Sequence, residues 1–134
     1  MPAIPRTMKA VVLQEPRRLT VEQVPVPEIG PHEILLKVGA CAMCGSDLEA
    51  YWGIHPSVKR YPVVLGHEFA GTVVAAGPKV RRYRVGDRIC HTGGRVCGVC
   101  AACERGDYHS CPERRGAGFV CDGAYAEYVA LLGD

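Results

Sequence analysis

The sequence has no long apolar run, no strong excess of one charge and no internal repeat. Its 134 residues carry 16 Lys and Arg against 14 Asp and Glu, and the basic residues are scattered rather than gathered into a stripe. The N-terminal stretch MPAIPRTMKAVVLQ lacks the apolar segment of a secretory signal. No apolar run reaches the roughly 20 residues that a membrane helix requires. These absences exclude a nucleic-acid or membrane partner and predict a soluble, cytoplasmic protein.

Glycine and proline are frequent, with 16 and 10 copies, and they separate a series of strand-like segments. The expected fold is therefore mainly β, with short strands in one domain over residues 1–134 that forms a partly open β-barrel. A short helix is expected over 46–52, ended by Gly53 and Pro56. Apolar periodicity predicts strands over 8–15, 19–26, 33–42, 67–77, 86–91 and 124–132.

Four of the eight cysteines lie in the stretch CGVCAACERGDYHSC, which begins at residue 97. A disulfide between cysteines separated by only two residues has strained geometry, and cytosolic thiols are kept reduced. Four thiolates satisfy a tetrahedral zinc ion, so we predict a zinc lobe over residues 95–112, with disulfides or inert buried cysteines as alternatives. His109 is a weaker candidate ligand, because four thiolates already fill the shell. The predicted ligands are Cys97, Cys100, Cys103 and Cys111.

A second thiol and imidazole lie upstream, in CGSDLE beginning at Cys44 and GHEFAG beginning at Gly66. Catalytic zinc keeps three protein ligands, Cys2His being one known set, and leaves a fourth position open. Cys44 and His67 supply two such ligands, and Asp47 is a carboxylate that can orient the imidazole. Spacing alone leaves ordinary core or surface roles open. Cys41 and Cys44 also form a C-x-x-C pair, although redox chemistry of that kind needs a βαβ context that this sequence lacks.

Several motifs follow one another in a specific order: KAVVLQEP, CGSDL, YPVVLGHEFAGTVVAAG, VGDRI, the four-cysteine lobe and DGAYAEYV. In this combination the sequence resembles the zinc-containing alcohol dehydrogenases of the medium-chain dehydrogenase/reductase superfamily. The resemblance implies a GroES-like N-terminal catalytic domain. It also implies zinc and NAD or NADP as cofactors, and reversible oxidation of a small alcohol or polyol to an aldehyde or ketone.

The resemblance also assigns roles to individual residues. Cys44 and His67 become ligands of a catalytic zinc, and Glu68 becomes a carboxylate that approaches the metal. In a regular strand Glu68 would face away from His67, so this role requires an irregular backbone, and an ordinary ion pair is the alternative. Ser46 falls on the hydroxyl that relays the substrate proton, with a helix N-cap as its other possible role. Asp47 falls on the carboxylate that orients the histidine, and the four clustered cysteines fall on the structural-zinc ligands.

The sequence departs from the family pattern in three ways. It has no G-x-G-x-x-G turn, since the nearest match, GAGFVC, has Cys121 at the third glycine. No cofactor-binding residue is therefore assigned, and NAD or NADP would need a Rossmann domain that is absent from this chain. The family's third catalytic-zinc ligand has no counterpart here, and Glu49 stands where members with the CGSDL stretch often have His. We expect the 134 residues alone to be inactive as a dehydrogenase.

A second interpretation is a non-enzymatic GroES-like module that holds one structural zinc and acts through protein contacts, and a homo-oligomer is possible under either interpretation. The expected substrate under the first is a small-molecule alcohol, aldehyde or ketone. Tyr51, Trp52 and His55 are candidates for its pocket wall, with ordinary packing as the alternative. The remaining cysteines, Cys41, Cys90 and Cys121, are expected to be small buried hydrophobic residues.

Overall fold

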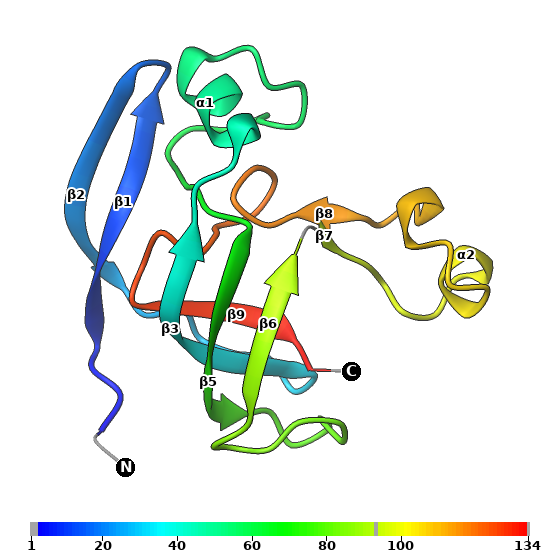
Figure 1. The fold of residues 1–134 in the computed structure, drawn as a ribbon. Coiled ribbons are helices and arrows are strands. Elements are labelled where there is room, and N and C mark those ends of the chain that lie inside the picture. Colours follow the sequence, from blue (N-terminus) through cyan, green and yellow to red (C-terminus); the bar gives the residue numbers. More distant parts are fainter. Residues whose placement is uncertain (1–2, 93, 134) are drawn as a thin grey trace.

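The computed structural model describes residues 3–92 and 94–133, and its backbone is mainly antiparallel β-sheet (Figure 1). The helical elements are α1 (Gly45–Trp52), α2 (Ala101–Glu104) and the 3-10 turn η1 (Tyr108–Ser110). The strands are β1 (Thr7–Glu15), β2 (Arg18–Pro25), β3 (Glu33–Ala42), β4 (Val63–Val64), β5 (Glu68–Ala76), β6 (Arg88–Thr92), β7 (Gly94–Arg95), β8 (Arg115–Gly116) and β9 (Tyr128–Leu132). No helix in the described part of the chain is long and apolar enough to cross a membrane.

Two sheets form the body of the molecule. The first has the order β2-β1-β4 and the second the order β6-β5-β3-β9, and every pair in them is antiparallel. A bridge between Ala10 and Ala126 joins β1 to the segment before β9, and the N–H of Val11 donates to the carbonyl of Tyr125 at 2.7 Å. The sheets are therefore linked at one side, which confirms the predicted GroES-like, partly open barrel.

Apolar residues on the inner faces of both sheets form the core. Ile34, Leu36 and Val73 have no exposed surface and pack with Phe69 and Val129 between β3, β5 and β9. A second cluster joins β1 and β4 to helix α1 and to the turn before β9, through Leu13, Ala50, Val63, Leu65 and Phe119. This second cluster anchors the three segments that carry the polar residues described below.

Helix α1 follows directly from β3. Cys44 is its N-cap, and the carboxylate of Asp47 accepts a hydrogen bond from the Cys44 N–H at 2.9 Å, which satisfies one of the amides at the helix start. Gly53 ends the helix with φ of 75°, a left-handed conformation that favours glycine, as the sequence predicted. The predicted N-cap role of Ser46 is wrong, because the helix begins two residues earlier.

The cysteine lobe is an excursion between β6 and β9, as predicted. It consists of the two-residue pair β7 and β8 with α2 and η1 beyond them, and Figure 1 shows α2 standing away from the barrel. In the described part of the chain, the four hydrophobic clusters contain no residue between β7 and β8. The lobe therefore has to be held together by something other than an apolar core.

Two expectations about local structure are corrected. The last strand begins at Tyr128 rather than at 124, because the amides of Ala124 and Tyr125 donate to the 65–66 segment at 2.9 Å, away from the neighbouring strand β3. Cys90 was expected to be buried and is exposed. It lies on β6, an edge strand, opposite the exposed Ala70, so its side chain faces away from the core.

Candidate metal centres and the adjoining cavity

The four cysteines of the lobe converge on one point. Their sulfurs all lie within 4.8 Å of one another, and Cys103 and Cys111 are buried. The Sγ–Sγ distances are 3.5 Å from Cys100 to Cys103, 3.9 Å from Cys97 to Cys103 and 3.7 Å from Cys97 to Cys111. A tetrahedron with Zn–S bonds of about 2.3 Å has edges of about 3.8 Å, whereas a disulfide bond measures about 2.05 Å. The donor set therefore fits a tetrahedral metal ion, and the cysteines are free thiols rather than disulfides.

The environment shifts the pKa values of Cys97 and Cys103 in opposite directions. The backbone N–H of Val99 lowers the pKa of Cys97 to about 7, so this thiol is already partly ionised at neutral pH. Burial raises the pKa of Cys103 to about 12, so a cation is needed to stabilise its thiolate. His109 is exposed and does not belong to the cluster.

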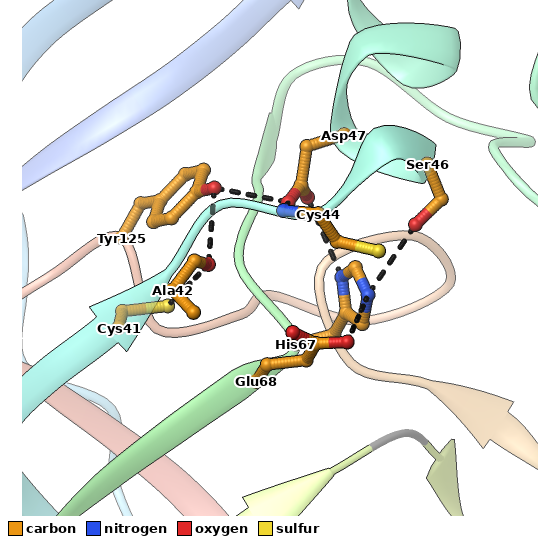
Figure 2. Close-up of polar contacts among 8 residues, drawn as sticks. All are labelled: Cys41, Ala42, Cys44, Ser46, Asp47, His67, Glu68 and Tyr125. Carbon is orange, nitrogen blue, oxygen red and sulfur yellow. Dashed lines mark hydrogen bonds and ion pairs between the residues drawn. The ribbon is translucent and has the colours of Figure 1, made fainter.

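A second group of ligand atoms lies where β3, α1 and β5 meet (Figure 2). One ligand atom each of Cys44, His67 and Glu68 lies within 4.8 Å of the others. Cys44 is the N-cap of α1, and His67 and Glu68 stand at the start of β5. Gly66, with φ of 93°, breaks the extended backbone just before them. The irregular backbone required for His67 and Glu68 to face the same point is therefore present.

The two ring nitrogens of His67 face different partners. Nδ1 lies 3.4 Å from Oδ1 of Asp47, and both atoms are buried without a hydrogen-bond partner among the described residues. Nε2 lies 3.3 Å from the Ser46 hydroxyl and 3.9 Å from Oε1 of Glu68. A slightly shorter distance between Nδ1 and Oδ1 would let Nδ1–H of His67 donate to Asp47. The lone pair on Nε2 would then face Cys44 and Glu68. The arrangement fits a metal ion bound through Nε2.

Sequence reasoning missed Tyr125. Its hydroxyl donates to Oδ2 of Asp47 at 2.9 Å and also lies 3.3 Å from the carbonyl of Ala42 (Figure 2). Burial, then the hydrogen bond to Asp47, raises the pKa of Tyr125 well above its usual range, so it stays a donor. Only the fold brings residue 125 beside residue 47, and no local motif could have indicated the contact.

The C-x-x-C pair does not have the electrostatics of a redox motif. Burial, followed by the charge of Asp47, raises the pKa of Cys41 to about 11. Redox-active thiols of this spacing have lowered pKa values instead. The environment of Cys41 therefore disfavours the redox interpretation.

A cavity of about 450 Å³ adjoins His67 and extends toward the cysteine lobe. Its lining includes His55, His67, His109, Arg114 and Phe119. Of the three candidates for a pocket wall, His55 therefore does line the cavity. Tyr51 instead packs against the cluster beneath α1, and Trp52 is 50% exposed with the Arg17 guanidinium 4.9 Å from its ring.

Comparison with known proteins agrees with this geometry. Residues 30–133 match the alcohol dehydrogenase GroES-like domain. The chain is 40% identical to sorbitol dehydrogenase of Bacillus subtilis over 98% of its length and 38% of that protein. It is 43% identical to L-threonine 3-dehydrogenase of Chelativorans sp. over 92% of its length and 37% of that protein.

Among solved structures, a cobalt- and zinc-bound thermostable alcohol dehydrogenase from Pyrobaculum aerophilum superposes with a TM-score of 0.85 at 29% identity. The match covers 94% of this chain and 39% of that one. The chain thus spans less than two-fifths of the length of each of these relatives.

Proposed function

This chain belongs to the alcohol dehydrogenase GroES-like domain family, and from that membership we propose that it is the N-terminal catalytic domain of a zinc-dependent, NAD(P)-dependent alcohol or polyol dehydrogenase. The reaction is the reversible oxidation of a small-molecule alcohol to an aldehyde or ketone. A cytoplasmic location suits this proposal, because thiolate ligands must stay reduced.

One observation carries the proposal: the ligand atoms of Cys44, His67 and Glu68 converge beside the hydroxyl of Ser46. A purely structural metal site has no need of an adjacent hydroxyl or of a cavity that opens onto one of its ligands. Here the cavity reaches His67, so a substrate can approach the metal position from the solvent side.

In this proposal Cys44 and His67 hold the catalytic zinc, with Glu68 able to approach it. When bound, zinc acts as a Lewis acid that lowers the pKa of a coordinated hydroxyl group. Ser46 accepts the proton of the substrate hydroxyl and passes it toward solvent. Asp47 fixes the tautomer of His67 by accepting from Nδ1–H, which makes Nε2 a better ligand.

Two parts of the site lie outside these residues. The 134 residues have no G-x-G-x-x-G turn, so NAD or NADP must be bound by a nucleotide-binding domain that the present residues do not contain. The third protein ligand is likewise not assigned here. Glu49, in the position where related sequences often have His, is exposed on α1, and the outer part of the proton relay is therefore not assigned to a residue here.

The lobe cysteines Cys97, Cys100, Cys103 and Cys111 are proposed to hold a second, structural zinc. The non-enzymatic alternative has this structural zinc but no catalytic zinc. The two proposals therefore differ in metal stoichiometry, two zinc ions per chain against one.

Elemental analysis of protein purified without chelator separates them. We expect two zinc ions in the wild type, one in Cys111→Ala and one in His67→Ala, while His32→Ala, an exposed histidine, keeps two. One zinc in the wild type that Cys111→Ala removes would contradict the catalytic site and favour the structural module.

Turnover provides an independent check. The 134 residues alone should show no NAD(P)-dependent alcohol oxidation. Measurable oxidation by the purified chain would contradict the need for a separate nucleotide-binding domain.

A further inference from the structure

The cavity beside His67 has a polar lining of one charge sign. Arg114 and three imidazoles contribute to it, together with Ser57, and no carboxylate of the described residues does. Arg114 is exposed, and its guanidinium has no ion pair or hydrogen bond with the described residues. An unpaired guanidinium presents a planar set of donors that suits a carboxylate or a phosphate.

His55, which lines the same cavity, has a hydrogen bond that fixes which ring nitrogen carries the proton. The backbone N–H of Ser57 donates to Nδ1 of His55 at 3.2 Å. A backbone N–H can only donate, so Nδ1 accepts and Nε2 carries the proton of the neutral ring. Nε2–H of His55 has no hydrogen-bond partner within residues 3–92 and 94–133, so His55 can supply this donor without needing to be charged.

Phe119 contacts both His55 and the metal-ligand candidate His67. Its ring stacks on His55 with centroids 4.1 Å apart at 16°, and it also contacts His67 with centroids 4.9 Å apart. Phe119 is buried in the cluster that supports α1, so the spacing between the two imidazoles is set by a packed side chain. The cavity thus has a metal-binding end at His67 and a cationic part at Arg114.

We propose that the substrate is a small alcohol that also carries an oxyanion, a carboxylate or a phosphate ester. Arg114 and His55 bind this oxyanion, while the hydroxyl-bearing carbon lies at the His67 end. The inference rests on the proposed dehydrogenase function and adds a substrate class to it. His109, which lines the same cavity, is an additional donor to the oxyanion.

Binding to the zinc-loaded 134-residue protein tests the proposal, with amide NMR shifts as the readout. Glycerol 3-phosphate and glycerate are the anionic probes, and glycerol is their neutral counterpart. We expect saturable shifts at Gly116, Ala117 and Val120, which line the cavity, with at least one of the anionic probes and not with glycerol at equal concentration.

Substitutions identify the residues that bind the anion. Arg114→Gln should weaken binding about 10-fold or more, since it removes charge-assisted hydrogen bonds, and His55→Gln should weaken it several-fold. Arg114→Lys should recover part of the loss, because it restores the charge without the planar donors. Arg18→Gln removes the same charge on β2, away from the cavity, and should leave affinity unchanged.

Several results would overturn the proposal. Equal binding of glycerol and both anionic probes, or equal weakening by Arg114→Gln and Arg18→Gln, would show that the cavity does not recognise an oxyanion. Tighter binding of ADP than of either probe would assign the anion to the nucleotide cofactor rather than to the substrate. Loss of anion binding in Cys44→Ser would place the anion on the metal instead of on Arg114.

The same samples separate this inference from the function on which it rests. Two zinc ions per chain without anion selectivity would contradict the substrate class and leave the metal-dependent function standing. One zinc per chain with Arg114-dependent anion binding would support the anion site and contradict the catalytic zinc.

Discussion

The hydroxyl of Tyr125 donates to Oδ2 of Asp47 at 2.9 Å, and the other oxygen of that carboxylate faces Nδ1 of His67 at 3.4 Å. Asp47 is 4% exposed, so its charge has few partners other than these and the Cys44 N–H. Tyr125 therefore holds the carboxylate in the rotation that presents Oδ1 to the histidine. In the proposed zinc site, Tyr125 would therefore act on the metal position through Asp47.

Tyr125→Phe should consequently weaken metal binding at Cys44 and His67. Loss of an outer hydrogen-bond partner of a metal site typically lowers the affinity for the metal about 10-fold or more, and we expect a loss of this order. Cobalt(II) titration, followed by its visible absorption after the lobe has been filled with zinc, measures it. The ¹⁵N shifts of His67 should show a mixed tautomer in the variant and protonated Nδ1 in the wild type.

Tyr61→Phe is the matched control, because it removes the hydroxyl of a tyrosine that is 37% exposed and outside this network. Unchanged cobalt affinity and an unchanged His67 tautomer in Tyr125→Phe would show that Asp47 is held by the remaining contacts alone.

The lobe should depend on metal more than the barrel does. Among the described residues, the four hydrophobic clusters include none between β7 and β8, so thiolate–metal bonds at the proposed structural zinc would supply what apolar packing supplies elsewhere. Chelation, or the variant Cys111→Ser, should therefore speed hydrogen exchange at the amides of α2 and η1. The amides shared by β3 and β5 should keep their protection.

Cys90→Ser, which alters an exposed thiol outside the lobe, is the control for this measurement. If chelation exposed β3 and β5 to the same extent as the lobe, the barrel and lobe would form one cooperative unit, against the present expectation.

The sequence predicted long strands rich in apolar residues well and short elements poorly. The third strand, 33–42, was predicted with the bounds it has, because its apolar segment, which begins with Ile34, Leu35 and Leu36, follows turn residues. Strands β4, β7 and β8 have two residues each, too few to show any period. Their pairing is decided by distant parts of the chain, as in the match of Val64 with Val12.

The same distinction applies to the site. The four-cysteine cluster was predicted because its ligands lie within one short segment and their chemistry is specific. Cys44 and His67 are far apart in sequence, so spacing alone left ordinary core or surface roles open, and the family resemblance was needed to favour a metal site. Tyr125 lies in the segment DGAYAEYV, which gave it no role of its own, and Arg114 lies in none of the motifs. Their importance depends on which residues the barrel brings beside them, and that is a property of tertiary structure.

The pKa of Cys41 leads to a prediction about thiol reactivity. Burial raises it to about 11, so at pH 8 only about one molecule in a thousand carries the reactive thiolate there, against about one in four for an ordinary thiol. Iodoacetamide should therefore modify Cys41 slowly at pH 8 and progressively faster as the pH rises toward 11. Timed labelling with peptide mass spectrometry measures the rate.

Exposed Cys90 provides the internal reference in the same experiment. Labelling of Cys41 at pH 8 as fast as that of Cys90 would contradict the raised pKa and reopen the redox interpretation of the C-x-x-C pair.

The turn at Gly123 ties the last part of the chain to the segment that carries His67. The N–H of Gly123 donates to the carbonyl of Val64 at 2.8 Å, and a Cβ built on Gly123 would collide with the carbonyl oxygens of Leu65 and Gly66. These are backbone atoms, so no side chain can rotate away to make room. Gly123→Ala should therefore push the turn off the 65–66 segment and lower the free energy of unfolding by about 1–3 kcal/mol.

Gly45→Ala is the matched control, because a Cβ there meets nothing within 4 Å and the residue begins helix α1, where alanine is favoured. Urea unfolding of the two variants measures the difference, and the same displacement should move His67 and reduce cobalt binding in Gly123→Ala. Tyr125 follows this turn by two residues. The loss of cobalt affinity in the double variant Gly123→Ala/Tyr125→Phe should therefore be no larger than the sum of the two separate losses. If Gly123→Ala were as stable as the wild type, the close contact between these two segments would not be a constraint on the position of His67.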